Sequence, residues 1–231
     1  MKLFSRLSAI GSILVLGSAF AAADTVTFGS FGTSVGAGGA TVVPTADQNT
    51  AVTFGGNATF NIGSGAPNVW APAGVNSSWV SYNGPTGPTG NVIAPNGVYT
   101  YTTTFTVAGG DYNGIISVLA DDTTDVILDN TTMLISAGTI GLDSHCADGT
   151  PNCLHPASFD FVNYALTGGI HTLTFNVQQT GLVYHGLDFY GGIATVSTRS
   201  LDPVPEPGTL FLLGSGLLGS AGTLMRRMRK A

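Results

Sequence analysis

Cysteine and histidine gather in one short segment, HCADGTPNCLH, where Cys146 and Cys153 stand seven residues apart beside His145 and His155. If the chain is exported, two thiols at this spacing most simply form a disulfide that closes a turn. The same four residues also suit zinc, which takes thiolate and imidazole ligands. Adjacent His-Cys pairs would have to fold back sharply to present both ligands. We therefore predict the disulfide, with a zinc site and free thiols as alternatives.

Carboxylates are dense in the segment ADDTTDVILDN, which holds Asp121, Asp122, Asp125 and Asp129. Calcium binds carboxylate oxygens, so Asp121, Asp122 and Asp125 form a candidate calcium site. The segment lacks the glycine and the terminal glutamate of an EF-hand loop. Aspartates in turns also accept hydrogen bonds from nearby backbone N–H groups. We predict this structural role in a turn, with calcium as the alternative.

Both tryptophans, Trp70 and Trp79, fall in the Gly-, Pro- and Asn-rich segment 66–97. Aromatic side chains at strand positions usually belong to the core. An indole ring on a loop can instead stack on a sugar ring at a binding surface. Trp70 and Trp79 are therefore the candidate ligand-binding residues, with core packing as the alternative.

Motifs of catalysis are scarce in this sequence. It has neither the H-E-x-x-H pattern of zinc peptidases nor a phosphate-binding loop. Its single glutamate, Glu206, lies close to the C-terminus, so a hydrolase built on paired carboxylates would have to use aspartates alone. We predict that the protein is not an enzyme, with a secreted hydrolase as an alternative.

Strand-like patterns position these side chains. Aromatic residues and valine alternate with threonine over residues 98–107, and residues 171–177 alternate in the same way. Period two is typical of a strand with one buried face. Further strand-like runs lie at 51–62, 115–120, 125–129 and 186–198, with turn residues between them. The sequence predicts an all-β fold in which one β-sandwich occupies residues 24–200.

Charge is distributed unevenly along the chain. Six of the seven Lys and Arg residues lie in residues 1–23 and 204–231, which leaves Arg199 and twelve aspartates in residues 24–203. This central part carries a formal charge of about −11, counted as one arginine against twelve aspartates. Such a surface repels nucleic acid, so we expect no nucleic-acid partner.

The N-terminal segment has the layout of a secretory signal peptide. Lys2 and Arg6 precede an apolar stretch that ends in three alanines at positions 21–23. Small residues after an apolar run are typical of a cleavable signal. We predict a signal peptide at 1–23, with an uncleaved anchor helix as the alternative.

The C-terminal segment 201–231 has three parts. Val204, Pro205, Glu206 and Pro207 come first, an apolar run follows from about 209 to 225, and four cations close the chain. These cations are Arg226, Arg227, Arg229 and Lys230. An apolar helix of this length spans about 25 Å, and the cations keep its end cytoplasmic. A plain membrane anchor is the alternative to a removable one.

This triple arrangement resembles the PEP-CTERM sorting signal of exported proteins in Gram-negative bacteria. The resemblance covers the last 28 residues and rests on the proline-flanked Glu206, the apolar run and the basic end. It implies processing by an exosortase, with the inner membrane as a transit intermediate. It also implies a setting in which exopolysaccharide is made.

Residues 98–193 resemble the jelly-roll of galactose-binding-like domains. The resemblance rests on ISVLADDTTDVILDNTTM, on HTLTFNV and on GLDFYGGI, with Asp129-Asn130 where that pattern has Asn-Gly. It implies a β-sandwich, with sugar binding as a class property.

We therefore predict a non-catalytic exported protein of the cell surface or extracellular matrix, sorted by an exosortase and associated with exopolysaccharide. A carbohydrate-binding module displayed by the same route is the alternative, and it would bind exopolysaccharide or another glycan. We expect no cofactor, apart from the calcium alternative at the aspartates.

Overall fold

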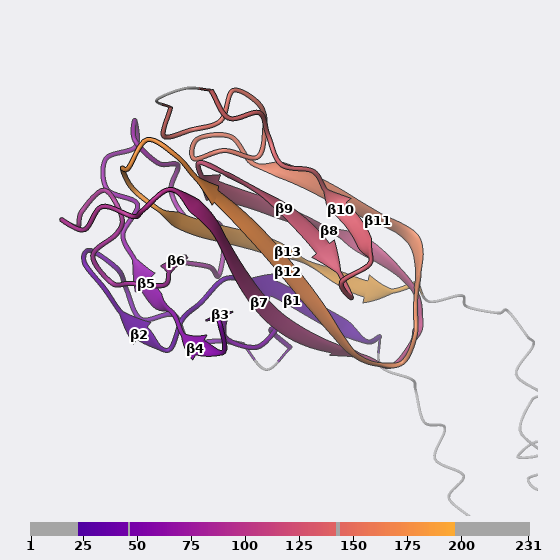
Figure 1. The fold of residues 1–231 in the computed structure, drawn as a ribbon. Helices are drawn as coiled ribbons and strands as arrows, with labels where there is room; N and C mark the ends of the chain where they lie inside the picture. The colour runs from indigo at the N-terminus through magenta and orange to yellow at the C-terminus, as the bar shows by residue number, and fades with distance from the viewer. Residues whose placement is uncertain (1–22, 46, 142–143, 197–231) are drawn as a thin grey trace, which may run out of the picture. The chain divides into compact units, whose positions relative to one another are not determined.

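The computed structural model describes residues 23–45, 47–141 and 144–196. The sorting region 201–231 and all but the last residue of the predicted signal peptide lie outside these ranges, so the structure tests neither of them. The described part is all-β, and no helix occurs within it (Figure 1). In those ranges, accordingly, no helix has the length and hydrophobicity to cross a membrane.

One sheet, here called sheet A, has seven strands. They are β1 (Thr25–Gly29), β2 (Ser34–Val35), β5 (Phe60–Ile62), β6 (Trp79–Ser81), β8 (Gly110–Asp121), β11 (Ala157–Leu166) and β13 (Gly186–Thr195). Their order is β11-β8-β13-β6-β5-β2, and β1 pairs with residues 190–194 in the C-terminal half of β13. Every pair is antiparallel except the short pair of β2 and β5.

The second sheet, here called sheet B, has six strands in the order β10-β9-β12-β7-β3-β4. They are β3 (Thr53–Phe54), β4 (Asn57–Ala58), β7 (Gly97–Val107), β9 (Thr123–Leu128), β10 (Thr132–Ile135) and β12 (Gly169–Gln179). The chain crosses from sheet A to sheet B at Asp122, between β8 and β9. Two sheets therefore face each other as a sandwich, which confirms the predicted fold class.

The main core lies between the two sheets. Phe175 of β12 stacks on Phe189 of β13 with ring centroids 4.5 Å apart, and Phe28 of β1 meets Phe105 of β7 edge to face at 5.3 Å. Each of these rings comes from the apolar face of an alternating strand, because a strand turns successive side chains to opposite sides. The strands predicted at 98–107 and 171–177 are confirmed as β7 and β12.

A second, smaller hydrophobic cluster lies on the outer face of sheet A. Leu119 alternates with the core residues of β8, so its side chain points away from sheet B. It packs with Trp70, Trp79, Ile62 and Cys153. Loops therefore cover part of this outer face, and they bring the aromatic and sulfur-containing residues together there.

Candidate functional site

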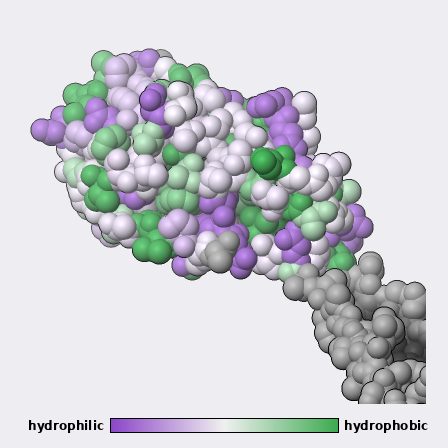
Figure 2. Space-filling view, turned by 90° about the horizontal axis from the view of Figure 1, so that it is seen from below, coloured by the Kyte–Doolittle hydropathy of each residue, from purple (hydrophilic) through white to green (hydrophobic). Residues whose placement is uncertain are grey.

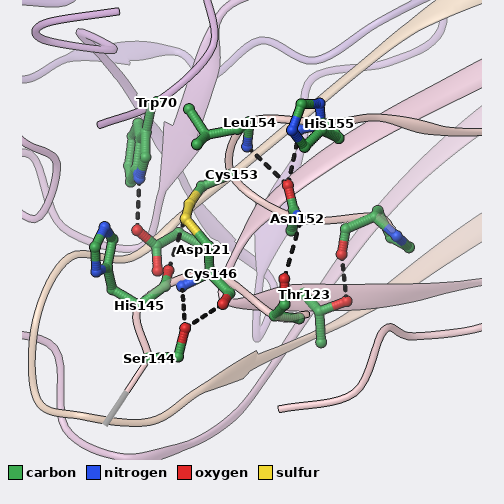
Figure 3. Close-up of a disulfide and its surroundings, with 12 residues drawn as sticks. Trp70, Asp121, Thr123, Ser144, His145, Cys146, Asn152, Cys153, Leu154 and His155 are labelled. Atoms are coloured by element: carbon green, nitrogen blue, oxygen red, sulfur yellow. Dashed lines mark hydrogen bonds between the residues drawn. A yellow bond between two sulfur atoms is a disulfide. The ribbon is translucent and has the colours of Figure 1, made fainter. Parts of the chain in front are cut away.

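The cysteines of the HCADGTPNCLH segment form the predicted disulfide. Cys146 and Cys153 are bonded, with their Cα atoms 5.4 Å apart (Figure 3). His145 lies beside them, but sulfurs that are bonded to each other cannot act as thiolate ligands for zinc. The loop is anchored to its surroundings, since Ala71 N–H donates to the Cys153 carbonyl at 2.8 Å. The disulfide prediction is confirmed.

The tryptophans do not form a sugar-binding surface. Trp70 and Trp79 are 0% and 1% exposed, and their rings stack on each other at 4.2 Å. Each indole N–H is also used inside the protein. Trp70 donates to Asp121 at 2.5 Å, and Trp79 donates to the Ala71 carbonyl at 2.9 Å. The prediction of ligand binding here was wrong, because the loop that carries Trp70 folds onto sheet A instead of standing in solvent.

The three aspartates of the calcium alternative do not converge. Asp121 ends β8 and lies beneath Trp70 in the interior (Figure 3). Asp125 lies on β9 and accepts hydrogen bonds from the backbone and side-chain N–H groups of Asn176 on β12. Asn176 alternates with core residues of sheet B, so Asp125 faces that sheet's outer side. The calcium alternative was wrong for this set of residues, since Asp121 belongs to sheet A and lies in the interior, whereas Asp125 belongs to sheet B and faces its outer side.

The turn interpretation of the same segment is only partly right. β8 and β9 are separated by Asp122 alone, so most of ADDTTDVILDN is strand. Asp122 does accept hydrogen bonds, but not from the nearby backbone as predicted: Thr180, 58 residues further along the chain, donates to it from its N–H at 2.6 Å and from its hydroxyl at 2.7 Å. Burial raises the pKa of both Asp121 and Asp122.

Asp188 is a further buried acid that the sequence did not single out. Its carboxylate accepts hydrogen bonds from the Ser30 hydroxyl at 2.7 Å and from Gly74 N–H at 2.8 Å. Burial raises its pKa. The bonds tie the residue that follows β1, strand β13 and the loop that carries Gly74 together. No sequence signal indicated this, since the partners lie far apart along the chain.

A buried histidine lies among tyrosines near the start of β7. The Nε2 atom of His185 is 2.8 Å from the Tyr101 hydroxyl, and Tyr99 packs against the imidazole at 4.1 Å. Tyr82 stacks on Tyr99 at 4.9 Å. Burial lowers the pKa of His185 to about 3, so its ring is neutral at physiological pH.

One G-x-S-x-G pattern occurs at residues 32–36, with Ser34 at its centre. In hydrolases this pattern forms a sharp turn between a strand and a helix, which exposes the serine as a nucleophile. Here Ser34 belongs to the two-residue strand β2 at the end of sheet A, and no helix follows it in the described ranges. The pattern therefore has a structural setting unlike that of a hydrolase.

A polar pocket of about 310 Å³ lies between the start of β1, the segment 47–50 and the C-terminal end of β7. The segment 47–50 bridges these strands, because Thr27 N–H donates to the Asp47 carbonyl and Thr50 N–H donates to the Thr104 carbonyl. The pocket's polar walls come from Asp24, Asp47, Gln48 and a set of threonines. In the view from below, a band of hydrophilic residues separates two groups of hydrophobic ones (Figure 2). Sequence reasoning missed this pocket.

Residues 203–230 match the family described as the PEP-CTERM protein-sorting motif. The match includes all the predicted motif residues, Val204 to Pro207, and the four terminal cations. The chain thus carries a PEP-CTERM sorting motif, which indicates export through the membrane and processing by an exosortase. These residues lie outside the described part of the structure.

No curated protein matches this chain. Among solved structures it is similar to a Podospora anserina GH26-CBM35 β-(1,4)-mannanase, with 14% identity over 64% of this chain and 25% of that one, at a TM-score of 0.30. A Paenibacillus cycloisomaltooligosaccharide glucanotransferase has 14% identity over 69% and 19%, also at 0.30. A ruminal GH26 endo-β-1,4-mannanase has 13% identity over 47% and 21%, at 0.23. The chain spans a quarter or less of their lengths, and likeness at this level carries no argument about its role.

Proposed function

We propose that this chain is a non-catalytic exported protein that an exosortase sorts to the cell surface or extracellular matrix of a Gram-negative bacterium. The observation that carries the proposal is the sorting motif at 203–230. The apolar run and terminal cations hold the chain in the inner membrane as an intermediate. In this proposal the exported domain is then displayed in association with exopolysaccharide.

The Pro-Glu-Pro element is the part that the exosortase recognises. Prolines at 205 and 207 remove two backbone donors and disfavour helix around Glu206. An extended segment of this kind suits a protease groove. The apolar run and the cations, by contrast, act only on membrane insertion and orientation.

Replacing Pro205-Glu206-Pro207 with three alanines in the native host tests this division of roles. We expect export to continue, while the variant keeps its apolar tail and stays in the membrane fraction. A variant in which the four terminal cations become glutamine is the comparison, and it should instead impair insertion and orientation. Equal processing of the alanine variant and the wild type would contradict recognition through Pro-Glu-Pro.

The non-catalytic assignment is supported by how the buried acids are used. Asp121 and Asp188 are fully buried and accept hydrogen bonds from groups within the domain. A carboxylate that serves as general acid or base must reach its substrate. Release of reducing ends from a panel of polysaccharides by the purified mature protein would contradict this assignment.

A further inference from the structure

We infer that the polar pocket between β1 and β7 binds a neutral, hydroxyl-rich ligand such as a single sugar residue. This pocket is lined by neither Trp70 nor Trp79, and binding there would not depend on sorting by an exosortase. Its volume of about 310 Å³ falls at the lower end of the range for small-molecule sites, roughly 300–1,000 Å³. A ligand of the size of one sugar residue therefore fits, and a polysaccharide could place only one of its sugar residues in the pocket.

The walls offer acceptors and donors in the mixture that sugar hydroxyls require. Asp47 is exposed at the pocket, and no hydrogen bond to its carboxylate occurs within the described residues. Thr106 is exposed as well, and its hydroxyl can both donate and accept. A carboxylate can accept from two neighbouring hydroxyl groups at once. Val26 and Phe105 also border the pocket, but their side chains are buried in the core, so the surface open to a ligand is mainly polar.

The pocket is held in shape before any ligand arrives. Asp24 accepts hydrogen bonds from Ala108 N–H at 2.7 Å and from the Tyr112 hydroxyl at 2.5 Å, so one of its oxygens is fixed. Across the pocket, the Thr50 hydroxyl lies 3.1 Å from that of Thr104 and accepts from its N–H at 2.9 Å. Groups that are already positioned lose less conformational entropy on binding.

The same chemistry disfavours other ligands. Phosphate and acidic polymers meet the carboxylates of Asp24 and Asp47, and no lysine or arginine falls within the described ranges. Cleavage after residue 23 would add one α-amino cation at Asp24, which leaves the two carboxylates in excess. An apolar ligand would leave the wall carboxylates and hydroxyls without partners. Calcium takes six to eight oxygens, largely from carboxylates and carbonyls, whereas this pocket provides two carboxylate side chains.

Binding is tested on the mature protein purified from its host, with methyl glycosides of the common neutral hexoses as probes. Two-dimensional NMR should show saturable amide shifts at 24–26, 47–48 and 104–106 for at least one glycoside. Asp47→Asn and Thr106→Val should each weaken that binding by about tenfold, as expected from losing one hydrogen bond at a bound ligand. Asp160→Asn on β11 and Thr100→Val on β7 are matched controls on exposed residues away from the pocket, and they should not change it.

Three results would overturn the inference. The first is the absence of saturable shifts at the pocket with every glycoside. The second is binding that the controls weaken as much as the pocket variants do. The third is shifts at the pocket with calcium chloride alone that Asp47→Asn abolishes, which would make it a cation site. Sorting in the host is measured separately, so its failure would leave this result unaffected.

Discussion

At the residue scale, the contact between Trp70 and Asp121 shows why one polar atom matters in a dry interior. Both residues are fully buried, and the indole N–H is the one donor within the described residues that hydrogen-bonds to the Asp121 carboxyl. The second carboxyl oxygen has no hydrogen-bond partner in that part of the chain. A buried polar group without a partner destabilises the folded state, so loss of this single bond should lower the free energy of unfolding.

Trp70→Phe keeps an aromatic ring but removes that donor. We expect the free energy of unfolding to fall by about 1–3 kcal/mol, the cost of leaving a buried acceptor without a partner. Trp79→Phe is the matched comparison, because it removes a bond to the uncharged Ala71 carbonyl and should cost less. Urea unfolding of both variants checks the order. An equal loss of unfolding free energy in the two variants would contradict a larger contribution from the bond to Asp121.

The pKa values of His171 and His185 are shifted in opposite directions. Burial lowers the pKa of His185 to about 3. Burial also lowers that of His171, but hydrogen bonds to the Thr167 carbonyl and to Asp129 outweigh it and raise the pKa above 6.5. His185 should therefore be neutral at pH 5 in NMR spectra of its ring nitrogens, while His171 is charged. Titration of His185 near 6.5 would contradict its burial.

These shifts have opposite effects on stability. The unfolded chain protonates His185 near pH 6.5 whereas the folded chain does not, so its contribution is full above that pH and declines as pH falls toward 3. His171 binds its proton more tightly when folded. Its contribution is present below pH 6.5 and is lost as pH rises through the folded pKa.

The disulfide was the residue-scale feature most accessible from sequence. Cys146 and Cys153 were the only thiols, so their spacing limited the outcomes to a few. The burial of Trp70 was not accessible in the same way. A Gly- and Pro-rich segment predicts irregular backbone, but whether a loop covers a sheet face depends on contacts with distant strands such as β6 and β8.

Breaking this disulfide should loosen the loop that it closes. The Cys146→Ser, Cys153→Ser double variant should lose roughly 2–3 kcal/mol of unfolding free energy, as chain entropy predicts for a short loop. Hydrogen exchange should rise more in residues 144–155 than in β7 or β12. Intact mass of the exported wild type should show the pair oxidised, and two free thiols would contradict the structure.

At the element scale, strand alternation assigns each side chain to the core or to an outer face. The pattern in residues 98–107 predicted β7 because its apolar and threonine positions separate cleanly. Strand β11, which is ten residues long, was not predicted, since its exposed and buried positions do not alternate regularly over its length. A bulge between Phe161 and Tyr164 shifts its register against β8. Irregular pairing of this kind is set by the partner strand and leaves little trace in sequence.

The stacked pair of Phe175 and Phe189 joins the two sheets at the centre of the core. Phe175→Ala should lower the free energy of unfolding by about 3–5 kcal/mol, because it removes buried surface and leaves a cavity. Val162→Ala on β11, where the side chain is 70% exposed, is the control and should change stability by less than about 0.5 kcal/mol. Chemical unfolding measures both. A small loss in Phe175→Ala would place the core elsewhere.

At the scale of the whole molecule, we propose that the two terminal segments direct export and sorting, whereas the sandwich carries the binding pocket. The three-part order of the C-terminal segment was recognisable from sequence, because it consists of proline, apolar and basic residues in a fixed order along the chain. The pocket between β1 and β7 was not, since its walls come from three segments that only the fold brings together.

Sorting by an exosortase is tested most directly at the C-terminus, which intact-mass spectrometry of the mature protein from its native host can measure. We predict that most molecules end near Pro205-Glu206-Pro207 and lack the apolar run and the four terminal cations. A population that still extends to Ala231 in most molecules would contradict sorting by an exosortase. It would leave the tail as a membrane anchor.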